Sequence, residues 1–253
     1  MADDAPLHIR AGEVRKTRPI DFGAPTYKDA AVPASYFDVD GTLVTTNLVH
    51  PTLFYLLNQS SPFRSLGKFA RAALKAPSMI VAEARDRRLF NEILFSTYEG
   101  ISQDRFLVLA DEAFETVIKR HLYPNAKDLV GRCRAEGHDV VLVSGGLDFL
   151  MQRLATYLGA THIIANRLEF KDGYATGRLL RPVVAGPEKA RLIRDHAREN
   201  GHDLTDCFAY SDSYSDVPML SVVGHPAAVN PDVKLARLAN AYGWPVLTMN
   251  PPS

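Results

Sequence analysis

The sequence predicts an α/β protein built on a doubly wound parallel sheet in three layers, interrupted by one helical insertion. From residue 126 onward, short apolar runs alternate with amphipathic stretches at helical spacing, as in folds made of strand–helix–strand units. The run Asp139–Val143 is apolar after its first residue, which is typical of a parallel strand buried on both faces. Residues 50–125 carry Leu, Phe and Ala at helical spacing with no strand pattern, and therefore predict an inserted helical cap.

The chain divides into an arm, a core in two segments, and the insertion between those segments. Residues 1–33 carry prolines and mixed charges with little periodicity, which predicts an extended N-terminal arm. A short buried strand over 35–40 is stopped by Gly41. We therefore expect the core to comprise 34–49 and 126–253, with the cap at 50–125.

The second core segment predicts alternating elements. Residues 127–136 form an amphipathic helix ended by Gly137, and Pro187 suits the first turn of a helix over 187–199. The pair Asp172-Gly173 between two short runs predicts a hairpin. The remaining expected elements are strands at 139–143, 161–165, 206–210 and 227–229, helices at 147–158 and from Val217, and hairpin strands at 167–170 and 174–178.

Composition and charge exclude several function classes. The 253 residues are 46% hydrophobic and 23% charged, which excludes a wholly disordered or fibrous chain. Lys and Arg total 29 and so do Asp and Glu, so we expect no nucleic-acid binding through bulk charge. The two cysteines, Cys133 and Cys207, disfavour a disulfide framework or a structural zinc site and fit a reducing compartment.

The N-terminus carries acidic residues where a secretory signal needs basic ones, and no apolar stretch follows. No segment approaches the ~20 uninterrupted apolar residues of a membrane-spanning helix. We therefore expect no transmembrane segment and a cytoplasmic location.

Polar residues gather where predicted strands end, which is where ligands bind in such sheets. Each group alone has an ordinary explanation, such as a turn, a helix cap or a solvated lysine. Together, four acids at one edge of a sheet would repel one another and raise each other's pKa unless a cation neutralised them. Mg²⁺ is a hard ion that prefers oxygen ligands and would resolve that conflict. The residues are Asp38, Asp40, Ser144, Lys189, Asp212 and Asp216.

The order of these motifs resembles the haloacid dehalogenase superfamily of hydrolases, in its phosphoserine-phosphatase-like branch (subfamily IB). The resemblance covers roughly residues 35–248 and is weakest in the cap. It implies a haloacid-dehalogenase-like core and a Mg²⁺-dependent phosphomonoester hydrolase acting on a small phosphorylated metabolite. The motifs are Phe37-Asp38-Val39-Asp40-Gly41-Thr42-Leu43, Val143-Ser144-Gly145-Gly146, Lys189, and the run from Tyr210 to Leu220.

The resemblance also implies a role for each motif residue. Asp38 would be the nucleophile that forms an aspartyl-phosphate. Asp40 would be the general acid that protonates the leaving oxygen, and then the base that activates water. Mg²⁺ would be bound by Asp38, Asp40 through its backbone carbonyl, and Asp212, with Asp216 supporting it directly or through water. The phosphate would be bound by Thr42, Ser144, Gly145 and Lys189.

Two positions depart from phosphoserine phosphatases. These enzymes carry a glutamate about nine residues after the nucleophile, which binds the amino-acid part of the substrate, and here that residue is Asn47. They also tend to have Asn before the second Asp of the last motif, where this chain has Ser215. Both departures weaken a phosphoserine assignment and leave the phosphoryl chemistry unchanged. The expected substrate is a small organic phosphate, phosphoserine-like or with a choline- or ethanolamine-type headgroup.

Basic residues in the cap leave a second substrate class open. Arg64, Lys68, Arg71 and Lys75, the stripe within 64–75, fall within ~60° of one another on a predicted helix. A solvated face is the simpler interpretation. The alternative is weak contact with an anionic membrane, with a lipid phosphate as substrate. A second basic group, Arg85, Arg87 and Arg88, offers a partner for a substrate carboxylate or second phosphate, and Tyr98 is expected on the cap's inner wall.

Two further function classes were weighed against hydrolysis. A non-hydrolytic, phosphorylation-switched module also uses an Asp, Mg²⁺, a hydroxyl residue and a Lys on a doubly wound sheet. Asp40 argues against it, because an acid two residues after the nucleophile empties the aspartyl-phosphate. A catalytically dead binding module would lack Asp38, Asp40, Lys189 or Asp212, and all four are present. Neither the substrate nor the oligomeric state follows from these motifs.

Overall fold

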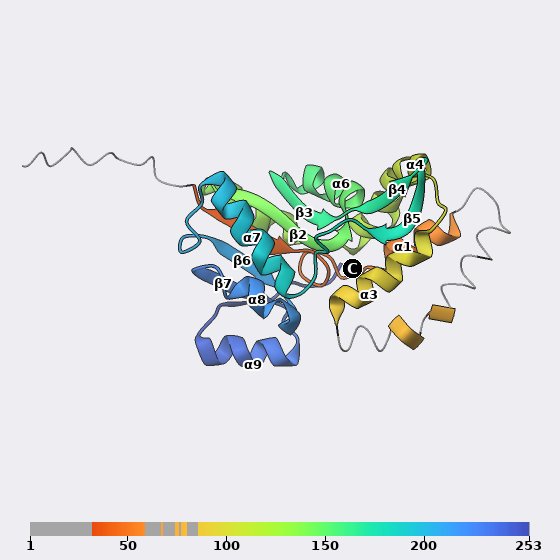
Figure 1. The fold of residues 1–253 in the computed structure, drawn as a ribbon. Coiled ribbons are helices and arrows are strands. Elements are labelled where there is room, and N and C mark those ends of the chain that lie inside the picture. Colours follow the sequence, from red (N-terminus) through yellow and green to blue (C-terminus); the bar gives the residue numbers. More distant parts are fainter. Residues whose placement is uncertain (1–31, 59–66, 68–73, 76, 80–85, 253) are drawn as a thin grey trace, which may run out of the picture. The chain divides into compact units, whose positions relative to one another are not determined.

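A six-stranded parallel sheet forms the centre of the protein (Figure 1). The computed structural model describes residues 32–58, 67, 74–75, 77–79 and 86–252. The strand order is β3-β2-β1-β6-β7-β8, so that β1 lies between β2 and β6 and pairs parallel with both. The strands are β1 (Ala34–Asp38), β2 (Asp139–Leu147), β3 (His162–Asn166), β6 (Phe208–Ser211), β7 (His225–Val229) and β8 (Val246–Leu247).

Alternate side chains of the central strands enter two separate hydrophobic cores, one on each face of the sheet. In β1, Phe37 belongs to one core and Tyr36 to the other. In β2, Leu142 and Val143 divide in the same way. This two-sided burial explains why the strands appear in the sequence as continuous apolar runs.

Helices cover both faces of the sheet and complete the three layers (Figure 1). On the Phe37 side lie α5 (Ala126–Ala135) and α6 (Asp148–Leu158), which contribute Val130 and Leu154 to that core. On the Tyr36 side, the core receives Ile193, Leu220 and Leu235 from the other three helices. These are α7 (Pro187–Asn200), α8 (Val217–Leu220) and α9 (Val233–Tyr242).

All the defined elements between β1 and β2 in the described part of the chain are helices or helical turns. Asp86 begins α3 by accepting hydrogen bonds from the backbone N–H groups of Arg88 and Leu89. A separate antiparallel hairpin packs against this segment, because Ser102 and Tyr174 form an isolated bridge. The helices are α1 (Val49–Leu57), α3 (Arg87–Phe95), α4 (Gln103–Ala113) and short turns at Ser96–Tyr98, Phe114–Ile118 and Lys119–His121; the hairpin is β4 (Leu168–Lys171) and β5 (Tyr174–Leu179).

The predicted fold class is confirmed: the sheet is parallel and doubly wound, and a helical segment is inserted after its first strand. The predicted first strand was too long, because β1 ends at Asp38 and the chain then turns at Gly41. Helix α9 and strand β8 were not predicted. The signal for α9 was Asp232, whose carboxylate accepts hydrogen bonds from the backbone N–H groups of Lys234 and Leu235.

Several predictions fall on residues outside the described ranges. The arm at 1–33 lies there except for its last two residues, and so do Arg64, Lys68, Arg71 and Arg85. Lys75 is described, and its Nζ donates to Ser96 Oγ at 2.6 Å.

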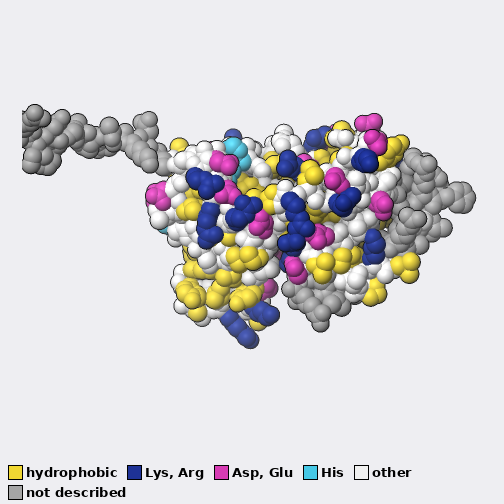
Figure 2. Space-filling model, in the orientation of Figure 1, with side chains coloured by type: hydrophobic (Ala, Val, Ile, Leu, Met, Phe, Trp, Pro, Cys, Tyr) yellow, Lys and Arg dark blue, Asp and Glu magenta, His cyan; other side chains and the backbone are white. Residues whose placement is uncertain are grey.

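Charged side chains on the surface of α7 form ion pairs with one another. Arg191 contacts both Glu188 and Asp195, and Arg198 also contacts Asp195. On the face in Figure 2, basic and acidic side chains are likewise interspersed. In the part of the chain that the structure covers, no helix is long and apolar enough to cross a membrane. Both cysteines are buried as free thiols.

Candidate active site

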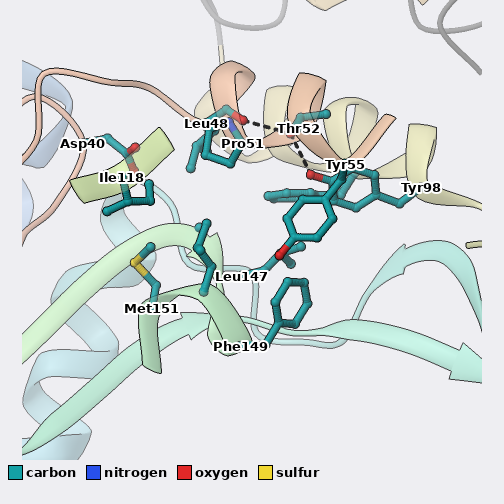
Figure 3. Close-up of a pocket in the computed structure, with 13 residues that line it drawn as sticks. Asp40, Leu48, Pro51, Thr52, Tyr55, Tyr98, Ile118, Leu147, Phe149 and Met151 are labelled. Carbon is teal, nitrogen blue, oxygen red and sulfur yellow. Dashed lines mark hydrogen bonds between the residues drawn. The ribbon is translucent and has the colours of Figure 1, made fainter. Parts of the chain in front are cut away.

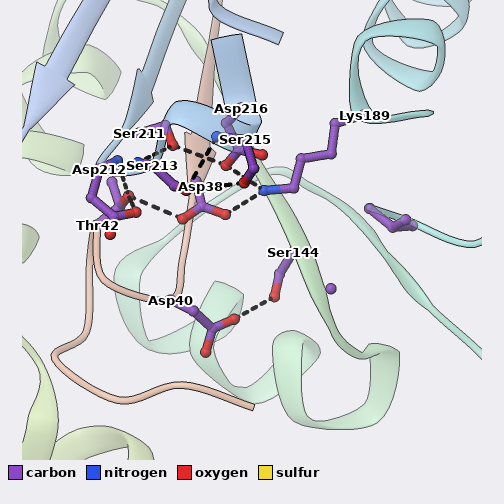
Figure 4. Close-up of polar contacts among 12 residues, drawn as sticks. Asp38, Asp40, Thr42, Ser144, Lys189, Ser211, Asp212, Ser213, Ser215 and Asp216 are labelled. Carbon is purple, nitrogen blue, oxygen red and sulfur yellow. Dashed lines mark hydrogen bonds and ion pairs between the residues drawn. The ribbon is translucent and has the colours of Figure 1, made fainter. Parts of the chain in front are cut away.

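The carboxyl ends of β1 and β6 bring Asp38 and the 211–216 segment together, although the two lie far apart in sequence. Phe37 is in register with Tyr210, so the residues that follow each strand leave the same edge of the sheet side by side. Figure 4 shows Asp38 surrounded by Thr42, Asp212, Asp216 and the end of the Lys189 side chain.

Lys189 is a buried cation between two carboxylates. Its Nζ lies 2.5 Å from Asp38 Oδ1 and 2.7 Å from Asp216 Oδ2, and only 6% of the residue is exposed. Pro187 begins α7 and places Lys189 in its first turn, from which the side chain reaches the sheet edge. Burial lowers the pKa of Lys189, but Asp216 and Asp38 outweigh it and raise that pKa overall, so the ammonium stays charged.

Asp216 binds Lys189 and Ser211 through one of its carboxylate oxygens. Its Oδ2 accepts hydrogen bonds from Ser211 Oγ at 2.9 Å and from Lys189 Nζ. Ser211 is itself completely buried at the end of β6. Asp216 therefore orients Lys189 toward Asp38, and Ser211 in turn orients Asp216.

The Thr42 hydroxyl joins the other two carboxylates. Thr42 Oγ1 lies 3.0 Å from Asp38 Oδ2 and 3.1 Å from Asp212 Oδ1, and it accepts the Asp212 backbone N–H at 3.0 Å. A hydroxyl has one hydrogen, so it can donate to only one of these oxygens at a time. When Thr42 donates to one of the two carboxylates, the oxygen of the other carboxylate lies near that negative charge and receives no hydrogen bond from Thr42.

The pKa values of both carboxyl groups reflect this crowding. Burial, followed by the charge of Asp38, raises the pKa of Asp212 to about 7. Burial also raises the pKa of Asp38, and Asp216 adds to this effect while Lys189 opposes it. A cation between Asp38 and Asp212 would favour their charged forms and reverse these shifts.

Gly41 leaves room for the Asp212 carboxylate. Its φ is +86°, in the left-handed region where glycine is favoured. A Cβ built at this position would lie 2.2 Å from Asp212 Oδ2. Both the turn after β1 and the placement of Asp212 therefore require glycine here.

Asp40 lies on the other side of the site, next to Ser144. Ser144 Oγ donates to Asp40 Oδ2 at 3.3 Å and accepts the Gly146 backbone N–H at 2.8 Å. Burial, followed by the Asp38 charge, raises the pKa of Asp40 to about 7. Near neutral pH, Asp40 can therefore both give and take a proton.

A cavity connects these groups, and Asp38, Asp40, Lys189, Gly145 and Arg87 are among the residues that line it. Asn91 of α3 also lines it and donates through Nδ2 to Val184 O at 3.3 Å. A Cβ on Gly145 would lie 2.9 Å from that nitrogen. Residues of the insertion therefore close over the edge of the sheet.

The donor set fits a hard divalent cation. Among the residues the structure describes, no three or more His, Cys, Asp or Glu side chains are grouped so that they could hold one ion. Lys189 offsets part of the negative charge of Asp38 and Asp216, and the predicted ligand set of Asp38, Asp212 and the Asp40 backbone carbonyl, supported by Asp216, stays a prediction. The carboxylates of Asp38 and Asp212, joined by Thr42 and fitted against Gly41, remain as hard oxygen donors suited to Mg²⁺.

The structure brings the predicted site residues together in two groups. One contains Asp38, Thr42, Lys189, Asp212 and Asp216, and the other contains Asp40, Ser144 and Gly145. Asn47 is exposed, and its side chain accepts the backbone N–H of Val49 instead of facing the cavity.

Ser211 and Asn91 were not among the predicted site residues. The signal for Asn91 was a polar residue among the apolar residues of α3, where it is only 3% exposed. Ser211 carried no such signal, because serine is common where a strand ends.

Comparison with known proteins identifies the family to which the sequence is similar. A family model described as haloacid dehalogenase-like hydrolase matches residues 36–221. A probable phosphatase of Mycobacterium tuberculosis is 32% identical over 226 residues, which cover 87% of this chain and 76% of that protein. A phosphoserine phosphatase of the same organism is 31% identical over 244 residues, covering 96% of this chain and 76% of that protein.

A solved structure of a substrate-bound phosphoserine phosphatase complex shares the fold. It superposes with a TM-score of 0.62 at 20% identity, covering 85% of this chain and 92% of that one.

Proposed function

Because the chain belongs to the haloacid dehalogenase-like hydrolase family and is a phosphatase, we propose that it hydrolyses a small organic phosphate monoester through an aspartyl-phosphate on Asp38. The observation that carries this proposal is the position of Asp38. One of its carboxylate oxygens contacts Lys189 and the other contacts Thr42, and it lies at the end of a central strand. The charge and orientation of this carboxylate are therefore defined before any substrate enters.

In the first step, an oxygen of the Asp38 carboxylate attacks phosphorus and the bond from phosphorus to the ester oxygen breaks. Asp40 gives its proton to the leaving oxygen, so that an alcohol departs rather than an alkoxide. Lys189 and the backbone N–H of Gly145 bind the phosphate oxygens from two sides of the cavity. Ser144 adds its hydroxyl, which contacts Asp40 in the absence of substrate.

In the second step, Asp40 takes a proton from water as the water oxygen attacks phosphorus. The bond from phosphorus to Asp38 then breaks, which releases inorganic phosphate and restores both carboxyl groups. The elevated pKa of Asp40, about 7, suits a group that must hold a proton in one step and lose it in the next.

Mg²⁺ would be bound by the carboxylates of Asp38 and Asp212 and by the Asp40 backbone carbonyl, and it would supply positive charge between nucleophile and phosphate. Asp216 would support the ion directly or through water, while Lys189 and Ser211 bind the Oδ2 atom of its carboxylate. The expected result of treatment with EDTA is complete loss of turnover, which added Mg²⁺ restores. Turnover that persists after chelation would contradict this assignment.

Replacing the nucleophile tests the proposal. Asp38→Asn keeps the shape and can still accept from Thr42, but it lacks the nucleophilic charge. We expect at least about a 10⁴-fold loss of kcat on a generic aryl phosphate with Mg²⁺ present. Asp104→Asn is the matched control, because Asp104 is an exposed residue of α4 outside the site. Activity retained by Asp38→Asn would reject the proposed nucleophile.

A further inference from the structure

A second cavity lies directly beside Asp40, and its walls are almost entirely apolar (Figure 3). It lies between α1, the turn at Ser96–Tyr98 and the start of α6. Among the 13 described residues that line it, Asp40 alone carries a charge. Aromatic rings make up much of the wall and come from Tyr55, Phe95, Tyr98 and Phe149.

The polar atoms of Thr52 and Tyr98 in this wall are already paired with each other. The Thr52 hydroxyl donates to Leu48 O at 2.8 Å and accepts the Tyr98 hydroxyl at 3.0 Å. An ammonium or carboxylate group that entered the cavity would lose its water, and Asp40 is the one charged partner that the described lining residues offer. Burial of an uncompensated charge is strongly unfavourable, whereas burial of an apolar group is favourable.

The position of this cavity relative to Asp40 indicates which part of the substrate it would receive. Asp40 and Leu48 line both this cavity and the one that contains Lys189, so the two spaces meet at the Asp40 carboxyl group. Lys189 and Arg87 attract the phosphate to the other side. A group that protonates the leaving oxygen must touch the alcohol part of the substrate. The apolar side of Asp40 is therefore the side of the leaving alcohol.

We propose that the substrate is a phosphate monoester of an uncharged, apolar alcohol, whose aromatic or branched aliphatic group occupies this cavity. The inference rests on the proposed phosphatase function and narrows it from small organic phosphates in general. It replaces the amino-acid-like or headgroup-like alcohol expected from the sequence. The same chemistry would be offered by a free ester or by the glycerol-linked chains of a lipid phosphate.

A substrate panel tests the inference on the intact enzyme with Mg²⁺. Benzyl phosphate and 3-methylbutyl phosphate present apolar alcohols, whereas phosphoserine and phosphoethanolamine present charged ones. We expect kcat/KM to be at least about tenfold higher for the apolar pair, since each buried CH₂ contributes about fourfold. Equal or higher values for phosphoserine or phosphoethanolamine would overturn the inference and leave the proposed function intact. Failure to hydrolyse any ester would instead reject the function.

A second experiment with lipid vesicles distinguishes a small metabolite from a lipid as the source of the apolar alcohol. Phosphatidic acid in vesicles is offered beside the free esters at matched phosphate concentration. Faster hydrolysis of the free esters identifies a small metabolite, and faster hydrolysis in vesicles identifies a lipid. Either result supports an apolar leaving group, provided that phosphoserine remains the poorer substrate.

A cavity variant ties the preference to these walls. Met151→Gln keeps an unbranched side chain of similar size but adds an amide to the lining. We expect kcat/KM for benzyl phosphate to fall at least about tenfold, while acetyl phosphate, which has little to place in the cavity, is unaffected. Met249→Gln is the matched control, because Met249 is equally buried but lines neither cavity. If Met151→Gln left the ratio of kcat/KM for benzyl phosphate to kcat/KM for acetyl phosphate unchanged, the inference would be overturned.

Binding to the unaltered enzyme provides a readout that no folding defect can disturb. Benzylphosphonate and methylphosphonate carry the same charged group but differ in the apolar part, and neither can be hydrolysed. We expect benzylphosphonate to inhibit with a constant at least about tenfold lower than that of methylphosphonate. Equal inhibition constants would show that the apolar cavity does not receive the leaving group.

Discussion

Lys189 lies in a cluster of charged groups that is shielded from water. A buried ammonium is costly unless carboxylates compensate it, and here Asp38 and Asp216 do so at short distances. Each of the three groups is less than a tenth exposed. The same contacts that stabilise the lysine also orient the proposed nucleophile, so folding and activity depend on one ion cluster.

Removing the lysine charge should therefore damage both properties. Lys189→Met leaves Asp38 and Asp216 buried without their cation, and we expect a loss of about 3–5 kcal/mol in the free energy of unfolding. Urea unfolding of the metal-free protein measures this loss. Adding Asp216→Asn should recover part of the stability but none of the activity, because one buried charge is removed while the phosphate ligand remains absent. A Lys189→Met protein as stable as the unaltered one would contradict the ion cluster.

The residues of this site could be predicted as a set, but their contacts could not. Parallel strands end at one edge, so Asp38 and Asp212 were expected to meet. Spacing alone does not show which neighbour a carboxylate faces, and the contact between Asp216 and Lys189 was therefore not predicted. The resemblance to phosphoserine phosphatases directed attention to Asn47, which turns away from the cavity.

Among the elements, the turn that follows β1 depends most on one residue type. Gly41 has a positive φ, and its missing side chain makes room for Asp212. Gly100 has a similar φ of +73° but has open space where a Cβ would lie. A side chain at Gly100 would therefore cause backbone strain alone, whereas a side chain at Gly41 would cause backbone strain and also collide with Asp212.

Substituting each of them by alanine distinguishes these two effects. Both Gly41→Ala and Gly100→Ala should lose roughly 1–2 kcal/mol in the free energy of unfolding, because alanine is unfavourable in the left-handed region. Gly41→Ala should also lower kcat/KM at least about 100-fold by displacing the Asp212 carboxylate, whereas Gly100→Ala should retain activity. Measurement of kcat/KM and thermal unfolding on both proteins checks this. Similar activity in the two variants would show that Asp212 tolerates displacement.

The elements most readily predicted were those with one dominant signal. The continuous apolar run of β2 and the Pro187 start of α7 are examples. Helix α9 was missed because it follows Pro231 closely and buries mainly Leu235 and Ala239, which weakens its periodicity. The aromatic cavity could not be foreseen, because it joins Tyr55 and Phe149 from separate elements.

For the whole molecule, a histidine cluster connects the sheet to α7 away from the active site. His196 Nδ1 lies 3.2 Å from the Tyr36 hydroxyl, and the rings of His162 and His202 lie 4.9 and 5.6 Å from the His196 ring. Burial, followed by the charges of His162 and His202, lowers the pKa of His196 to about 4. His196 is therefore neutral in the folded protein at neutral pH.

This cluster predicts acid sensitivity. A histidine whose pKa is lower in the folded than in the unfolded state contributes its full stability above about pH 6.5, and that stability is lost as the pH falls toward 4. His196→Asn removes the titration but leaves an oxygen to accept from Tyr36. Between pH 7 and pH 5, the unaltered protein should lose about 1–2 kcal/mol more than the variant in the free energy of unfolding. Urea unfolding at both pH values would contradict this if the losses were equal.

The central claim is that phosphate is transferred to the Asp38 side chain, and it can be measured directly. The enzyme and its Asp40→Asn variant are incubated with an aryl phosphate and Mg²⁺, quenched in acid, digested and analysed by mass spectrometry. We expect a phosphate adduct on the peptide that contains Asp38, with higher occupancy in Asp40→Asn because this variant lacks the base that activates water. Turnover with no adduct on that peptide in either protein, or an adduct on a different residue, would contradict the account.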